Sequence, residues 1–96
     1  MTITIGPQRA ALTDAELVRS IALRDCERMR AERDDAMARM RHAARRCETT
    51  TAADALREVA RLDEAIIRAL EVAADPHAEL RRRERATVRV MLGGAL

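Results

Sequence analysis

The feature that most constrains this chain is the stretch from residue 8 to residue 75, which contains neither glycine nor proline. These two residues interrupt helices most often, so nothing in the stretch forces the chain to turn. In its first part, apolar residues recur every three or four positions, which is the α-helical period. They stand at 18, 22, 26, 29, 36, 40, 43 and 47. The pattern predicts an all-α fold that opens with a long helix over about 13–47.

The start of this first helix carries a capping sequence. Thr13 and Glu16 have the spacing of a capping box, and Leu12 and Leu17 stand where a hydrophobic staple requires apolar residues. A polar segment at 30–35 interrupts the apolar stripe and could mark a kink, or a second helix capped by an aspartate. Because the helical period continues on both sides, we predict one continuous helix.

A turn and a second helix are expected next. Three consecutive threonines at 49–51 disfavour helix continuation and offer hydroxyl caps, so we place a turn in the segment 48–54. Apolar residues then resume at helical spacing and predict a second helix over about 52–74. A short turn between two amphipathic helices predicts a long antiparallel helical hairpin.

A shorter third helix is expected over about 76–92. Asp75 is a good N-cap, and Pro76 suits the first helical position. Gly93 and Gly94 are expected to end the helix as a C-terminal cap. Its apolar positions are few: Leu80, Val88, Val90, Met91 and Leu92.

The core that these helices can form is small. The chain has 96 residues, enough for a single domain over 1–96, and it has no Phe, Tyr or Trp, which bury the most area per residue. We therefore expect marginal monomer stability or help from a second chain. The first predicted helix also outruns the second by about a dozen residues. The third helix, a second copy of the chain or another protein must therefore cover Leu17, Val18 and Ile21.

The charges are nearly balanced but unevenly distributed. Eighteen basic residues, all arginines, face sixteen acidic ones, and the net charge of +2 is too small to identify a nucleic-acid binder. The arginines gather in two clusters, one near the end of the first helix and one in the third. The candidate partner-binding residues are Arg39, Arg41, Arg45, Arg46, Arg81, Arg82, Arg85 and Arg89.

Three interpretations of these clusters remain open. They can be solvated helix surface, a contact for phosphate groups, or a contact for an acidic protein face. The first is favoured, because arginines near a helix C-terminus are stabilised by the helix dipole. Arg81, Arg85 and Arg89 also form a single stripe, as on a wet helix face. A duplex-backbone binder would need arginine alone, so phosphate contact survives as an interpretation.

No residue pattern points to catalysis, a cofactor or a metal ion. Cys26 and Cys47 both fall on the apolar stripe of the first helix, so two buried free thiols are expected. His42 lacks the spacing to a cysteine that zinc sites use, and Ser20 has no base at helical spacing to activate it. The sequence predicts no enzyme and no catalytic, cofactor-binding or metal-binding residues.

The N-terminal residues 1–11 are expected to form an extended segment, in which the alternating residues 2–5 are followed by a turn at Gly6 and Pro7. No stretch of the sequence is apolar enough to span a membrane, and the N-terminus lacks the order of a signal peptide. Both observations predict a cytoplasmic location without membrane contact.

These features predict a non-catalytic protein-binding module: a small regulator, an adaptor or a stoichiometric inhibitor of a larger protein assembly. A phage-encoded inhibitor of host defence is one such setting, although no motif in the chain supports it. A protein partner is expected, with a homodimer as one option. The alternatives are a basic-helix nucleic-acid binder that contacts phosphates, which is not favoured, and a self-assembling coiled-coil structural protein.

Overall fold

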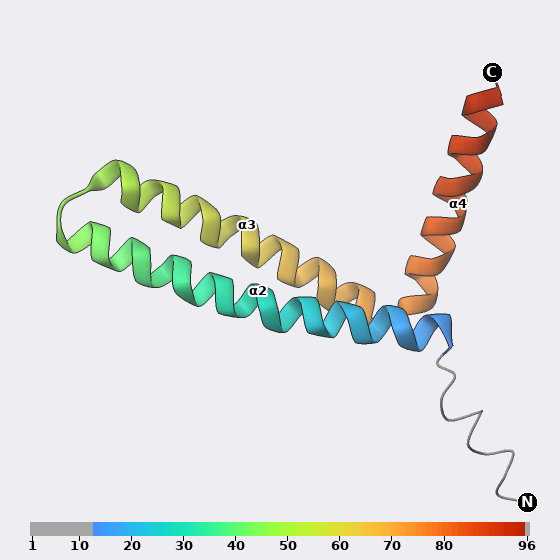
Figure 1. Cartoon of the computed structure of the whole chain (residues 1–96), viewed down its shortest axis with the longest axis horizontal. Coiled ribbons are helices and arrows are strands. Elements are labelled where there is room, and N and C mark those ends of the chain that lie inside the picture. Colours follow the sequence, from blue (N-terminus) through green and yellow to red (C-terminus); the bar gives the residue numbers. More distant parts are fainter. Residues whose placement is uncertain (1–12, 96) are drawn as a thin grey trace, which may run out of the picture.

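The computed structural model describes residues 13–95, which form three helices (Figure 1). Helix α2 spans Asp14–Arg45, α3 spans Thr49–Ala74 and α4 spans Pro76–Ala95. Helices α2 and α3 lie side by side as an antiparallel hairpin, and α4 projects from the open end of that hairpin (Figure 1). The predicted all-α hairpin with a shorter third helix is confirmed. The extended segment predicted for 1–11 and the staple residue Leu12 lie outside the described residues.

Helix α2 is continuous, as the apolar period predicts, and begins with the expected capping box. The Thr13 hydroxyl accepts a hydrogen bond from the Glu16 amide at 3.1 Å, and the Glu16 carboxylate accepts one from the Thr13 amide at 3.0 Å. The polar segment at 30–35 does not break the helix, and within it Arg33 donates a hydrogen bond to the Asp63 carboxylate on α3. The arginine that interrupts the apolar stripe therefore joins the two helices.

The core lies between α2 and α3. Its centre consists of Cys26, Met29, Leu62 and Ile66, and Leu62 is only 2% exposed. The Cys26 thiol donates to the Ile66 carbonyl at 3.7 Å, so this buried thiol also has a partner across the hairpin. Small side chains fill most of the other buried positions and let the two backbones approach: Ala15, Ala22, Ala36, Ala43, Ala55 and Ala73.

The reversal between α2 and α3 differs from the sequence expectation. The three threonines form the first turn of α3 instead of a loop, and the chain reverses at 46–48. The Glu48 amide donates to the Ala43 carbonyl at 2.9 Å, and the Cys47 amide donates to the Ala44 carbonyl at 3.1 Å. This is the Schellman arrangement that ends a helix. It completes the turn within the end of α2, so no threonine is needed for it.

Cys47 makes this turn by adopting a positive φ of 58°. The prediction that it lies buried on the helical stripe is wrong, because the residue has left the helix and is exposed. Cys26 is buried, as predicted.

Helix α4 begins as predicted and ends later than predicted. The Asp75 carboxylate accepts a hydrogen bond from the Ala78 amide at 3.1 Å, and Pro76 is the first helical residue. The helix then continues through Gly93 and Gly94 to Ala95, and neither glycine has a positive φ. The predicted glycine cap is therefore wrong: a left-handed cap would fold the chain back, and here the helix simply runs on.

The length difference within the hairpin is smaller than expected, 32 residues in α2 against 26 in α3. Val18 is consequently buried against the rest of the chain, at 7% exposure. Leu17 and Ile21 are 47% and 49% exposed, and α4 does not fold back to cover them. Of the three apolar residues that were expected to be covered, only Val18 is buried within one chain.

The molecule is flat and elongated. Its smallest extent is 17 Å, against 65 Å along its longest axis. The radius of gyration of 20.1 Å exceeds the roughly 12 Å of a compact chain of this length. Helical domains normally bury such broad faces under a second layer, but in this chain both broad faces of the hairpin are open.

Candidate protein-docking surface

The first turn of α4 is organised around Glu79, whose side chain is 8% exposed. The Nε atoms of Arg82 and Arg83 each donate a hydrogen bond of 2.9 Å to its carboxylate. The bond from Arg82 holds the pKa of Glu79 below its ordinary value; burial works in the opposite direction, and Arg83 adds to the lowering. Arg82, one of the candidate partner-binding residues, is thus engaged in an internal ion pair.

The remaining candidate residues of α4 have no such engagement. Arg81, Arg85 and Arg89 repeat every four residues, are exposed, and form no ion pair within the described part of the chain. Side chains at this spacing lie on one helical face. Five arginines against two glutamates give α4 a net charge of +3.

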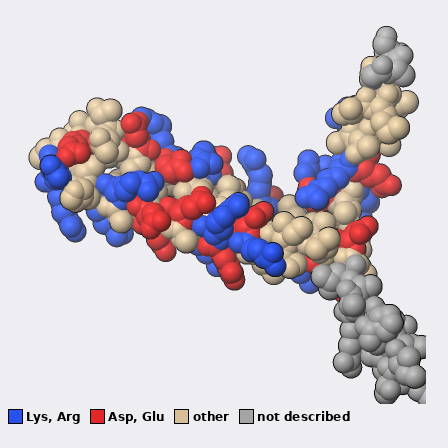
Figure 2. Space-filling model, in the orientation of Figure 1, with Lys and Arg blue, Asp and Glu red and all other residues tan. Residues whose placement is uncertain are grey.

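Beyond the arginines, the end of α4 is apolar and uncovered. Every residue from 81 to 93 is exposed. Figure 2 shows basic side chains near the start of the projecting helix and uncharged ones towards its end. The large apolar side chains there are Val88, Val90, Met91 and Leu92, which are 50–74% exposed. A helix of this kind presents an apolar surface bordered by positive charge.

The arginine cluster of the first helix lies at the other end of the hairpin. Arg39, Arg41 and Arg45 belong to the last turns of α2, and Arg46 pairs with Glu48 across the reversal at 3.0 Å. The hairpin turn and the start of α4 are at opposite ends of the molecule (Figure 1). The structure therefore does not bring the two predicted clusters together into one surface.

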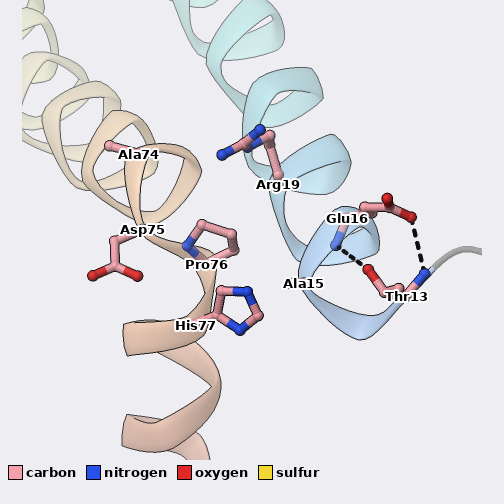
Figure 3. A pocket seen from close by; sticks show the side chains of 8 residues that line it. All are labelled: Thr13, Ala15, Glu16, Arg19, Ala74, Asp75, Pro76 and His77. Atoms are coloured by element: carbon pink, nitrogen blue, oxygen red, sulfur yellow. Dashed lines mark hydrogen bonds between the residues drawn. The ribbon is translucent and has the colours of Figure 1, made fainter.

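A hollow at the open end of the hairpin has a volume of about 300 Å³ (Figure 3). Its polar groups are already used by the helix ends: Thr13 and Glu16 form the capping box, Asp75 caps α4, and Arg19 donates to the Ala73 carbonyl at 3.0 Å. The hollow lies where three helix ends meet, and the hydrogen bonds of these four side chains cap or connect those ends.

Two further findings concern metal ions and membranes. Within the described residues, no group of three or more His, Cys, Asp or Glu side chains is arranged to hold a metal ion. None of the described helices combines the length and the apolar character needed to cross a bilayer.

Sequence reasoning missed a second set of exposed apolar residues, on the hairpin itself. Leu23 on α2 and Leu56, Ile67 and Leu70 on α3 are 41–56% exposed. Leu56 and Leu70 are among the apolar residues whose helical spacing predicts the second helix, and together these residues make a wide apolar face. A two-helix hairpin can bury only the middle of such a face. The width of the apolar face was therefore the sequence signal that residues at its edges would be exposed.

No protein-family model, curated protein sequence or solved structure matches this chain.

Proposed function

We propose that this protein is a cytoplasmic, non-catalytic protein-binding module in which α4 is the docking helix. It acts as a small regulator, adaptor or stoichiometric inhibitor of a larger protein assembly, and it works as a homodimer. The observation that carries the proposal is the complete exposure of α4 from residue 81 to residue 93. A helix of this length is marginally stable alone and normally depends on packing of an apolar face, which nothing in the described chain supplies here.

The partner of α4 is a protein surface with an apolar groove and acidic residues around it. The groove receives Val88, Met91 and their neighbours, as amphipathic helices are received in known helix-in-groove complexes. Acidic residues on the groove's rim face Arg81, Arg85 and Arg89, where complementary charge speeds association and selects the partner. A second α4 does not fit this role, because two helices of charge +3 repel each other.

Site-specific photo-cross-linking tests the proposal. A photoreactive residue replaces Met91, 70% exposed on α4, or as a control Ala31, exposed on α2. In a nuclease-treated lysate of the native cell, position 91 is expected to give an adduct with one protein, mapped by mass spectrometry to an acidic, apolar-lined surface. Position 31 is expected to give none. Replacing Arg81, Arg85 and Arg89 with glutamate should abolish the adduct.

Other results would contradict this function. An adduct that requires nucleic acid, with affinity falling steeply as salt rises, supports the phosphate-binding alternative. Adducts only to further copies of the chain, in fibres or higher oligomers, support a self-assembling scaffold. Equal labelling from positions 31 and 91 would remove the special role of α4.

A further inference from the structure

One broad face of the hairpin carries two rows of side chains with the same pattern. On α2 the row is Leu23, Arg30 and Met37; on α3 it is Leu56, Asp63 and Leu70. Members of each row are seven residues apart, which is two helical turns, so they point in nearly the same direction. Each row reads apolar, charged, apolar. Leu23, Leu56 and Leu70 are 41–54% exposed.

The ion pair between Arg33 and Asp63 shows that both rows border the same face. Asp63 is the middle of the α3 row, and Arg33 adjoins the α2 row on the helix surface because Arg30 and Met37 are three and four residues away. The pair crosses from one helix to the other, so the rows run side by side along the hairpin.

The register of the hairpin aligns the two rows. Arg19 donates a hydrogen bond to the carbonyl of Ala73, and Cys26 donates one to that of Ile66. Residue numbers therefore rise along α2 as they fall along α3, and the two residues at any level have numbers that sum to about the same value. Leu23 is consequently level with Ile67 and Leu70. Arg30 is level with Asp63, and Met37 with Leu56. Along these two rows, apolar residues therefore lie at both ends, and an arginine lies beside an aspartate in the middle.

We propose that this face binds the same face of a second copy of the chain, in a two-fold dimer whose axis runs along the hairpin. The inference deepens the homodimer part of the proposed function and does not involve the α4 docking surface. In this arrangement α2 packs antiparallel on α3 of the partner, and the two hairpins form a four-helix bundle, the common way to bury such faces.

Complementary charges and complementary apolar residues both favour a second copy of the chain as the partner that binds this face. With the axis along the hairpin, Leu23 meets Ile67 and Leu70 of the partner, Met37 meets Leu56, and Arg30 meets Asp63. The Asp63 carboxylate has two oxygens, so it can accept Arg33 from its own chain and Arg30 from the partner. An axis perpendicular to the helices would instead place each Arg30 against the other, and like charges in contact disfavour that packing.

The available area is adequate for a stable dimer. The 26 residues of α3 make about 39 Å of helix, and two packed helices are about 18 Å wide, which gives roughly 700 Å² per copy. Standard stable interfaces bury about 800 Å² per partner. Helix α4 leaves the face open, because it projects away from the hairpin (Figure 1). The two-fold axis sends the two α4 helices to opposite sides, where both stay accessible.

The first test is the solution mass, measured by light scattering over a range of concentrations, with circular dichroism to verify helicity. The wild-type protein is expected to have twice the 10.7 kDa mass of one chain. Ile67 adjoins the α3 row, because it is four residues after Asp63 and three before Leu70, and it is 56% exposed. Ile67→Glu is therefore expected to give a helical monomer. Ile21→Glu is the matched control: this residue is 49% exposed, but it is two positions from Leu23 and so points away from the α2 row, and the dimer should persist.

The second test determines the direction of the two-fold axis by disulfide trapping in a Cys47→Ala background. A mixture of the Leu23→Cys and Leu70→Cys variants is expected to form a cross-linked heterodimer, because these residues meet across the interface. A mixture of Leu23→Cys and Met37→Cys should not. The reverse result would overturn the proposed axis.

Two results would overturn the dimer through this face. They are a monomer of the wild-type protein at every concentration, and a dimer that survives Ile67→Glu. If the surviving dimer were instead lost in Met91→Glu, α4 would be part of the interface. None of these results is the cross-linking result that tests α4 docking, so the dimer and the docking of α4 fail separately.

Discussion

Cys47 holds the left-handed backbone conformation that ends α2, with a φ of 58°. For residues other than glycine this conformation costs roughly 1–2 kcal/mol, since the Cβ atom crowds the following carbonyl oxygen. Glycine is the usual residue at this position of a Schellman turn, because it has no Cβ. The exposed cysteine therefore occupies a strained position in a turn that hydrogen bonds from Glu48 and Cys47 otherwise complete.

Cys47→Gly is expected to raise the free energy of unfolding by about 1 kcal/mol, by removing this strain. Urea denaturation followed by circular dichroism measures the change. Cys47→Ala is the matched control: it removes the thiol, keeps the Cβ atom, and should leave stability near that of the wild type. If alanine stabilised as much as glycine, the thiol and not the backbone would be responsible.

At the scale of the element, α4 depends on its first turn. Asp75 caps the helix, and Glu79 holds Arg82 and Arg83. Beyond Arg83, the described residues of α4 make one side-chain hydrogen bond, from the Thr87 hydroxyl to the Arg83 carbonyl at 3.0 Å. The pKa of Glu79 lies below its ordinary value of 4.5, chiefly because of the hydrogen bond from Arg82. A carboxyl group whose pKa is lower in the folded state stabilises that state above its unfolded pKa, and the contribution disappears as the pH falls through the folded value.

Glu79→Gln is accordingly expected to weaken α4 at pH 7, with a difference from the wild type that shrinks as the pH falls below about 4.5. Hydrogen exchange of the α4 amides across this pH range measures the effect. Glu84→Gln on the same helix, an exposed residue that forms no ion pair in the described chain, should leave exchange in the first turn nearly unchanged. A difference that persisted undiminished at low pH would mean that the carboxylate charge is not the cause.

At the scale of the whole molecule, stability depends on one small core between two helices. Leu62 is at its centre and is 2% exposed.

Leu62→Ala should lower the free energy of unfolding by about 2–5 kcal/mol, the range for truncating a buried leucine. Small domains have only about 5–15 kcal/mol in total, so the variant should be largely unfolded or unfold at much lower urea. Leu17→Ala, at a residue 47% exposed, should cost less than about 1 kcal/mol. Similar losses in both variants would mean that Leu17 is covered in solution.

Much of the fold follows from local features of the sequence. The Thr13–Glu16 capping box, the helical apolar period and the Asp75–Pro76 helix start each act within one or two turns, and the structure confirms all three. The three threonines misled the prediction of the turn, because the hydrogen bonds that end α2 made the reversal without them. The glycine pair misled the prediction of the end of α4, because glycine permits a left-handed cap without requiring it.

Spacing along the chain could show that the helices are amphipathic, because side-chain direction depends only on the helical period. It could not show how much of each apolar face would be buried, since that depends on which neighbours the helices meet. Only the packing of α2 against α3, with α4 directed away from both, decides that Leu62 is buried and that Ile67 and Met91 are exposed. The candidate binding surfaces of this protein are the apolar faces that one chain is too small to cover.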